Sequence, residues 1–255
     1  MLQLLIFSAL AAGNDGETQM QLGSDMLPMA MAWYVVFIVS TTAHEAAHAF
    51  AALKLGDPTA YHGGQVTLDP LPHIRREPFG MVVIPLLSFA LSGWMFGWAS
   101  TPYDPMWAYH NPKKSAMMAL AGPAGNLVLV LVAAALIHLG IFAGFFIMPD
   151  GINFSSIVAP ASSGIANGAA ILVSILFSLN LLLFVFNLIP LPPLDGRAIM
   201  EFFLKGQVLE KYRIIMSNPS MRMFGLFIAW TVFDYIFSPI LTLSLNLLYP
   251  GAEYR

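Results

Sequence analysis

The chain contains no cysteine and few charged residues among its 255 positions. Without cysteine it can form neither a disulfide framework nor a cysteine zinc ribbon, so any metal site must use histidine and carboxylate side chains. Only 10% of the residues are charged, whereas an ordinary soluble domain carries about 25%. This low charge argues against a soluble globular domain. The net charge of -3 excludes nucleic-acid binding through a basic face, and the apolar composition excludes a disordered chain.

Apolar residues make up 58% of the chain, and the mean hydropathy is +0.72. Several uninterrupted apolar runs reach the roughly 18 residues that a membrane-spanning helix needs. These runs predict an all-α polytopic membrane protein. An alternation of polar and apolar residues after two glycines predicts a small β-hairpin or sheet element. We expect about five to six membrane segments, one of them re-entrant or a hairpin because proline and glycine interrupt it.

The apolar runs and the polar stretches between them divide the chain into three regions. Residues 1–28 contain a short apolar segment, Met1 to Ala12, which is a cleaved signal, a short helix or an interfacial segment. An acidic stretch that we interpret as a solvated loop follows, and Pro28 opens the next helix. Residues 201–255 comprise a basic cytosolic loop and a C-terminal membrane span. The core region, 29–200, contains in order helix 29–53, a β element at 61–71, a re-entrant or hairpin segment at 79–98, and spans 115–148 and 168–190.

The helix at 29–53 carries the sequence His44-Glu45-Ala46-Ala47-His48. On a helix the two histidines lie at i and i+4 on one face, so both imidazoles can bind one zinc ion. The glutamate between them then lies beside the metal, where it can deprotonate a water molecule. Ionisable residues inside a membrane segment are costly and are functional by default. The alternative is a buried polar cluster that holds helices together.

A zinc ion bound by two histidines needs a third protein ligand. Two carboxylates are candidates at comparable depth: Asp234 lies within the last span, and Asp195 follows the Pro-rich end of the span at 168–190. Three prolines stop a helix, and a broken segment of this kind can direct Asp195 inward. A simple helix terminus followed by a turn is the alternative.

Two motifs, HEAAH and the Pro-rich sequence from Asn187 to Gly196, together resemble the site-2 protease family of intramembrane zinc metalloproteases, in particular its compact branch without a PDZ domain. Further segments are similar to that branch in order and spacing: 56–60, 65–71, 96–99 and 121–126. The resemblance implies that one zinc ion per chain is bound by His44, His48 and Asp195. It also implies Glu45 as the general base of an endopeptidase that cleaves a substrate's transmembrane helix, in the membrane or near its cytosolic face.

The candidates for binding substrate or the oxyanion have weaker signals. Asn126, at the end of Ala121-Gly122-Pro123-Ala124-Gly125-Asn126, is either a donor to the oxyanion or substrate backbone, or an interhelical hydrogen-bonding residue. The predicted strand at 64–69 could hold an unwound substrate by β-augmentation, and the alternative is a hairpin that caps the domain. The candidates in that strand are Gln65, Val66 and Thr67, and Asn187 is a further one.

The sequence therefore predicts a zinc-dependent intramembrane endopeptidase that acts on membrane-protein substrates in a lipid bilayer and has no nucleic-acid partner. A zinc-binding scaffold or sensor would need the ligands but no base, so Glu45 argues against it. A zinc transporter would space ionisable groups across the membrane, whereas the strong ligands here lie at one depth. Lys and Arg follow the spans that carry the motifs, which places the site toward the cytosol, and we expect a prokaryotic plasma membrane.

Overall fold

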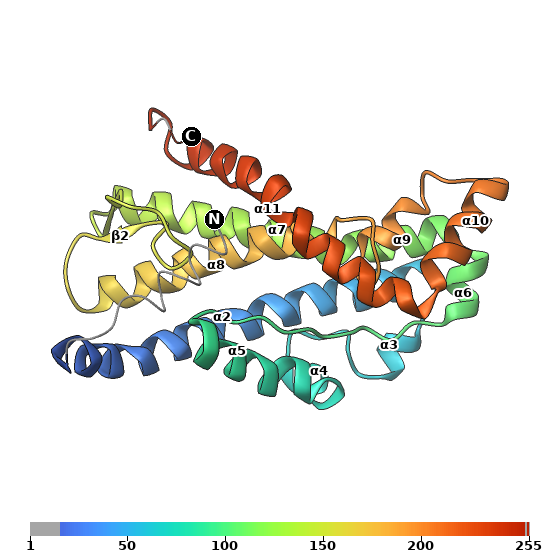
Figure 1. Cartoon of the computed structure of the whole chain (residues 1–255), viewed down its shortest axis with the longest axis horizontal. Helices are drawn as coiled ribbons and strands as arrows, with labels where there is room; N and C mark the ends of the chain where they lie inside the picture. Colours follow the sequence, from blue (N-terminus) through green and yellow to red (C-terminus); the bar gives the residue numbers. More distant parts are fainter. Residues whose placement is uncertain (1–15, 253, 255) are drawn as a thin grey trace. The chain divides into compact units, whose positions relative to one another are not determined.

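The computed structural model describes residues 16–252 and 254, and their side chains from residue 26 onward. The predicted short apolar segment, Met1 to Ala12, therefore lies outside the described residues. Four long helices dominate the fold (Figure 1): α2 (Gly16–Leu55), α7 (Pro112–Phe142), α8 (Ile165–Asn187) and α11 (Pro219–Leu248). Each contains a stretch that is long and apolar enough to cross a membrane. The prediction of an all-α polytopic membrane protein is confirmed.

The chain forms two compact units, and the boundary between them falls within α2, α7 and α8. The second unit contains both motif histidines, the glutamate between them and the aspartate of the Pro-rich motif. The whole candidate metal site is therefore described within one unit. The first unit comprises the described residues of Met1–Thr42, Asp69–Ser100 and Ala135–Leu179, and the second comprises those of Ala43–Leu68, Thr101–Ala134 and Asn180–Arg255.

Helix α2 begins earlier than the sequence pattern predicted. Residues 16–26 are helical, so the interpretation of this part as a solvated loop is wrong, and Pro28 lies inside the helix instead of opening it. The segment is rich in Glu, Gln, Met and Leu, which favour helix even where they are polar. A proline within a membrane helix is tolerated because neighbouring groups can satisfy the backbone carbonyl that it frees. The helix ends at Leu55, and Gly56 then adopts a φ of 105°, which favours glycine.

The small β element is present, but it lies elsewhere in the chain than predicted. Strands β1 (Phe146–Ile147) and β2 (Ala159–Pro160) pair antiparallel between α7 and α8. Residues 61–71, all of which the structure describes, contain no strand, so the predicted β element at this position is wrong. They contain the end of α3 (Thr59–His62), a turn with a bend, and the start of α4 (Pro70–Arg76).

Local hydrogen bonds explain why the segment at 61–71 turns instead of pairing as a strand. The Gln65 N–H donates to Ala60 O at 2.9 Å, which closes the turn after α3. The Asp69 side chain accepts from the Leu71 N–H at 2.9 Å and caps α4, whose first residue is Pro70. An alternation over only six residues is outweighed by such contacts.

After α4 the chain folds back on itself. A π-helical turn, η1 (Phe79–Val83), continues into α5 (Ile84–Ser92), and the chain then returns so that the Trp98 N–H donates to Gly80 O at 3.1 Å. A Cβ on Gly97 would lie only 2.1 Å from Gly80 O, so this approach requires glycine. The two helical pieces together rise about 21 Å, against a hydrocarbon core of about 30 Å. A re-entrant or hairpin path of this segment in the membrane stays a prediction.

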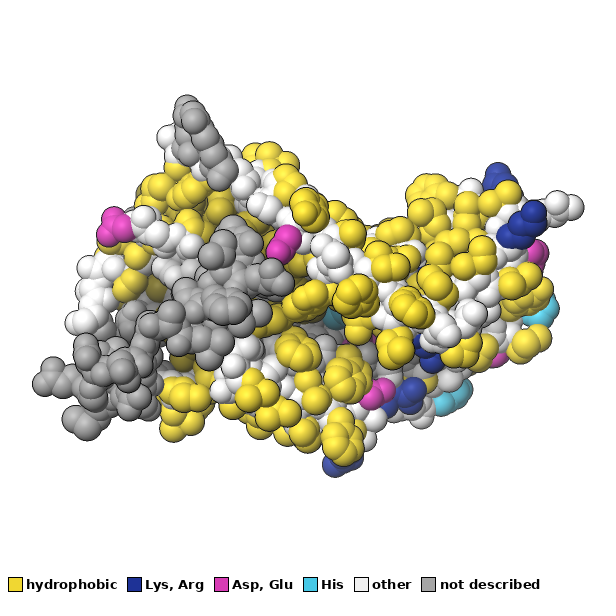
Figure 2. Space-filling model, viewed as in Figure 1, with side chains coloured by type: hydrophobic (Ala, Val, Ile, Leu, Met, Phe, Trp, Pro, Cys, Tyr) yellow, Lys and Arg dark blue, Asp and Glu magenta, His cyan; other side chains and the backbone are white. Residues whose placement is uncertain are grey.

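The surface of the described residues is mostly apolar. Hydrophobic side chains cover much of the face shown in Figure 2, and many belong to candidate spans. On α7 the Phe142 side chain is 92% exposed, and on α11 the Leu247 side chain is 71% exposed. A soluble protein rarely exposes this much contiguous apolar surface, whereas a lipid-facing surface is apolar. Shorter helices complete the fold: α6 (Pro105–His110), α9 (Gly196–Met200) and α10 (Gly206–Ser217).

Candidate metal centre

Two histidines four positions apart and an aspartate far from them in the sequence meet in the second unit. His44 and His48 lie near the end of α2, and Asp195 immediately precedes α9. Asp195 Oδ2 is 3.1 Å from His44 Nε2 and 3.3 Å from His48 Nε2, and the two Nε2 atoms are 3.0 Å apart. The ligand atoms of the three residues all lie within 4.8 Å of one another, so this group can hold a metal ion.

A carbonyl oxygen holds the other ring nitrogen of each histidine. His44 Nδ1 donates to Asn126 Oδ1 at 2.6 Å, and His48 Nδ1 donates to Met118 O at 2.8 Å. Because a carbonyl oxygen only accepts, each Nδ1 carries the proton and each Nε2 presents a lone pair. Two lone pairs and a carboxylate oxygen at these separations repel one another unless a cation lies among them. In zinc sites, a hydrogen bond from Nδ1 to an oxygen atom commonly orients a histidine that binds the metal through Nε2.

A glycine of α7 leaves space beside the two Nε2 atoms. A Cβ built on Gly122 would lie 2.2 Å from His48 Nε2 and 2.6 Å from His44 Nε2. Zinc–nitrogen bonds are about 2.0–2.1 Å long, so a side chain here would compete with a bound metal for the same space. The residues present therefore fit a zinc ion with two histidines and one aspartate, which leaves a fourth position for water or substrate.

The Pro-rich segment after α8 places Asp195. The chain packs tightly here, because a Cβ on Gly196 would lie 2.2 Å from Ile189 O. The Asp195 carboxylate thereby faces both Nε2 atoms through its Oδ2, and a carboxyl group must be ionised to bind a metal ion. Asp234, the other carboxylate considered, does not belong to the metal-binding group found among the described residues.

Glu45 is buried beside the histidines and bonds to a threonine. Thr101 Oγ1 is 2.7 Å from Glu45 Oε2 and 2.9 Å from Glu45 O. Sequence reasoning missed Thr101, because a threonine in a polar, Pro-rich stretch belongs to no motif. The two residues are 56 positions apart in the sequence, and only the fold brings them together.

Asn126 is fully buried and links the zinc-site histidine to a third helix. Its Oδ1 accepts from His44 Nδ1, and its Nδ2 donates to Asn180 Oδ1 at 2.8 Å. These bonds connect α2, α7 and α8, which corresponds to the interhelical alternative for Asn126. A direct role of its amide toward substrate stays a prediction. Asn180 was missed, although a lone asparagine within an apolar span was a visible signal.

The other candidates for substrate binding lie in two different segments. Gln65 is buried, and its Oε1 has no hydrogen-bond partner among the described residues. Val66 and Thr67 are half-buried in the bend before α4. Asn187 Nδ2 donates to Leu183 O at 3.0 Å within α8. The roles of these residues toward substrate stay predictions. Residues 64–69 form no strand, so the structure does not support substrate binding by β-augmentation at this segment.

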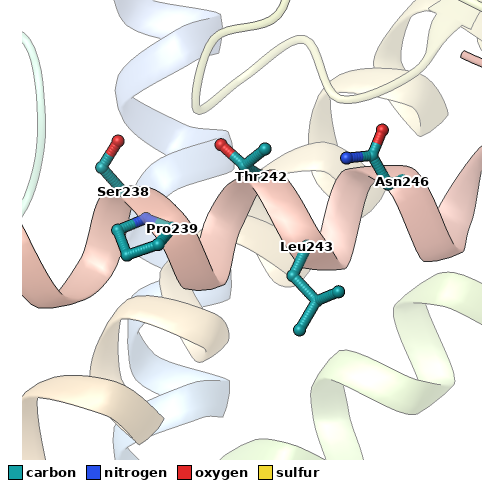
Figure 3. Close-up of a pocket in the computed structure, with 5 residues that line it drawn as sticks. All are labelled: Ser238, Pro239, Thr242, Leu243 and Asn246. Atoms are coloured by element: carbon teal, nitrogen blue, oxygen red, sulfur yellow. The ribbon is translucent and has the colours of Figure 1, made fainter. Parts of the chain in front are cut away.

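A separate cavity of about 480 Å³ lies along α11 (Figure 3). Three polar side chains, Ser238, Thr242 and Asn246, point to one side of the helix in this view. Pro239 and Leu243 complete the lining. The cavity is lined by no histidine or carboxylate, so we assign no metal or acid–base chemistry to it.

These features define the class of protein. The chain has apolar helices long enough to span a membrane, and it brings together two buried histidines and one half-buried aspartate, with a buried glutamate between the histidines in sequence. A structural zinc site closes its coordination sphere with four protein ligands, whereas three ligands and an adjacent glutamate are typical of a hydrolytic zinc site.

Comparisons with known proteins identify the family. Residues 32–228 match Peptidase family M50, and the chain belongs to this family, the site-2 proteases. No PDZ domain is part of the match. The chain is therefore a zinc metalloprotease and an integral membrane protein. No solved structure matches it.

Two bacterial relatives carry names that agree with the family. "Putative zinc metalloprotease YwhC" of Bacillus subtilis (strain 168) is 34% identical over 187 residues, which cover 72% of this chain and 75% of that protein. "Putative zinc metalloprotease Rip2" of Mycobacterium tuberculosis (strain H37Rv) is 28% identical over 223 residues, which cover 86% of this chain and 76% of that protein. The shared region thus includes most of each chain.

Proposed function

We propose that this zinc metalloprotease cleaves peptide bonds in or near the transmembrane helices of membrane-anchored proteins. One observation carries the proposal: His44 and His48 lie on α2 within Met26–Leu55, a stretch long and apolar enough to span a membrane. A protease whose ionisable residues lie in a membrane segment meets its substrate at that depth. Location in a prokaryotic plasma membrane, with the site toward the cytosol, belongs to the same proposal.

Residues of the chain itself supply the proton transfers. Zinc bound at this centre would lower the pKa of a water molecule toward about 7 and stabilise negative charge on the scissile carbonyl oxygen. The Glu45 carboxylate accepts the proton of the attacking water and then delivers it to the leaving amine. Asn126 Oδ1 and Met118 O keep the imidazoles of His44 and His48 in the tautomer that leaves each Nε2 free.

The buried glutamate also separates a protease from the two competing functions. A zinc-binding scaffold or sensor needs the three ligands but gains nothing from a carboxylate placed as a base. A zinc transporter needs ionisable groups at successive depths, whereas the metal-binding group among the described residues is a single cluster, His44, His48 and Asp195.

Substrate trapping tests the proposed function. A Glu45→Gln protein should bind substrates that it cannot cleave, so mild-detergent purification and mass spectrometry should find membrane-anchored proteins enriched on it relative to the wild type. The purified wild type should then cleave a captured protein within or beside its transmembrane helix, and fragment masses locate the bond. Cleavage confined to soluble domains, or enrichment of soluble proteins alone, would contradict the proposal.

The proposed topology follows from the positions of positive charge. Lys54 lies in the last turn of α2 and Arg75 follows that helix, Lys113 lies at the start of α7, and Arg197 follows α8, whereas residues 150–167 contain no Lys or Arg. An excess of Lys and Arg marks the cytosolic side. The end of α2 and the start of α7 therefore lie on the same side, and the apolar helix between them does not cross. Its length and the return of Trp98 to Gly80 support a re-entrant or hairpin path.

Cysteine accessibility tests this topology, because the natural chain contains no cysteine. Single cysteines at Leu71 and His110, both of which are exposed, lie on either side of the proposed re-entrant segment. Both should react with a membrane-impermeant thiol reagent only from the cytosolic side of oriented vesicles. A cysteine within residues 150–167, for example at Ser162, should react from the opposite side. Labelling of positions 71 and 110 from opposite sides would show that the segment crosses the membrane.

A further inference from the structure

Thr101 contacts Glu45 at two of its oxygen atoms. The Thr101 hydroxyl lies 2.7 Å from Glu45 Oε2 and 2.9 Å from Glu45 O. Both oxygens only accept, and a hydroxyl has one proton to donate, so this proton links the carboxylate to the backbone of its own helix. Glu45 is 5% exposed, so little water competes for the contact. Because the hydroxyl engages Oε2, the second carboxylate oxygen is left to accept a proton.

A buried aspartate fixes the segment that carries Thr101. Asp57 lies two positions after the end of α2, and its Oδ2 accepts from the Asp104 N–H at 2.8 Å. Its Oδ1 accepts from Thr59, through N–H at 3.0 Å and through Oγ1 at 2.5 Å. Burial opposes ionisation of Asp57, but these hydrogen bonds outweigh it and hold its pKa below the usual range. Residues 101–104 are thus tied at one end to α2 and at the other to the turn that follows it.

We propose that Thr101 is a positioning residue that holds the Glu45 carboxylate in the orientation in which it accepts the proton of the attacking water. The inference rests on the proposed role of Glu45 as general base. A glutamate side chain is flexible, and a donor fixed by the fold restricts its carboxylate to one geometry. Such restriction matters because a displacement of about 1 Å can cost about 100-fold in rate. The Thr101 hydroxyl is hydrogen-bonded to Glu45, whereas the proposed ligands are His44, His48 and Asp195, so zinc binding should not depend on Thr101.

Three variants of the zinc-loaded full chain test the inference, with a fluorogenic transmembrane peptide as substrate. Thr101→Val keeps the shape but removes the hydroxyl, so kcat should fall about 10- to 100-fold, with KM and zinc content unchanged. Thr101→Ser restores the hydroxyl and should recover most of kcat. Ser100→Ala is the matched control: it removes the neighbouring hydroxyl, which donates to Glu77 Oε1 instead, and should keep the wild-type kcat.

Each other outcome overturns the positioning role. A wild-type kcat in Thr101→Val, or no recovery in Thr101→Ser, would show that the hydroxyl does not act through Glu45. Lost zinc would make Thr101 a structural residue, and a raised KM with unchanged kcat would make it a substrate contact. The Glu45→Gln variant separates this inference from the proposed function. Full activity of Glu45→Gln would contradict the role of Glu45 as general base. An inactive Glu45→Gln variant together with a fully active Thr101→Val variant would contradict only the positioning role of Thr101.

Discussion

Replacing Glu45 with glutamine is expected to lower proteolysis by a factor of about 10² to 10⁴ while zinc stays bound. Glutamine keeps the size of the side chain and can still accept a hydrogen bond from Thr101, but it cannot take up a proton. Glu45 lies outside the group formed by His44, His48 and Asp195, so its charge is not needed to hold the metal. Initial rates with a transmembrane peptide and the zinc content of the same sample measure both effects.

Matched variants distinguish the loss of the general base from the loss of a zinc ligand. Alanine at His44, His48 or Asp195 should remove zinc and activity together, because each substitution deletes a ligand atom. Glu210→Gln makes the same chemical change at a glutamate of α10 whose side chain is 52% exposed, and it should keep both. Full zinc content in Asp195→Ala would exclude Asp195 as a ligand and make Asp234 the next candidate.

Replacing Gly122 with alanine is expected to weaken zinc binding about 10- to 100-fold, although glycine supplies no ligand atom. The added Cβ would lie 2.2 Å from His48 Nε2 and 2.6 Å from His44 Nε2, well inside contact distance. Both imidazoles are held on their far side by Asn126 Oδ1 and Met118 O, so they cannot turn away without losing those bonds. Competition with a zinc chelator measures the affinity, and proteolysis should fall with zinc occupancy.

A second glycine provides the control for Gly122→Ala. Gly168 lies within α8, and no atom lies within 4 Å of a Cβ built there. Alanine in a helix interior is favoured over glycine by about 1 kcal/mol, so Gly168→Ala should keep wild-type zinc affinity and activity. A Gly122→Ala protein that elutes like the wild type in gel filtration is then compared with it in zinc affinity. An unchanged affinity would show that the metal does not occupy the space beside the two Nε2 atoms.

The sequence alone determined those features that depend on neighbouring positions along the chain. Long apolar runs predict membrane spans because the bilayer sets their length. The i, i+4 spacing of His44 and His48 places both imidazoles on one helix face whatever the rest of the chain does. The interrupted segment at 79–98 was marked by its own proline and glycines, and the structure shows the chain returning there from Trp98 to Gly80.

Only the tertiary structure decided which distant residues meet. Spacing could not choose between Asp195 and Asp234, because the third ligand is selected by which distant segment reaches the two histidines, and in the structure this is the segment that carries Asp195. The strand predicted at 64–69 was outweighed by turn and cap bonds that a short alternation does not reveal. Thr101, 56 positions from Glu45, carries no local signal, and the visible Asn180 gives no indication of its partner Asn126, 54 positions away. Periodicity reports which face of a helix is apolar, whereas the partner of a buried polar group is set by which helices pack together.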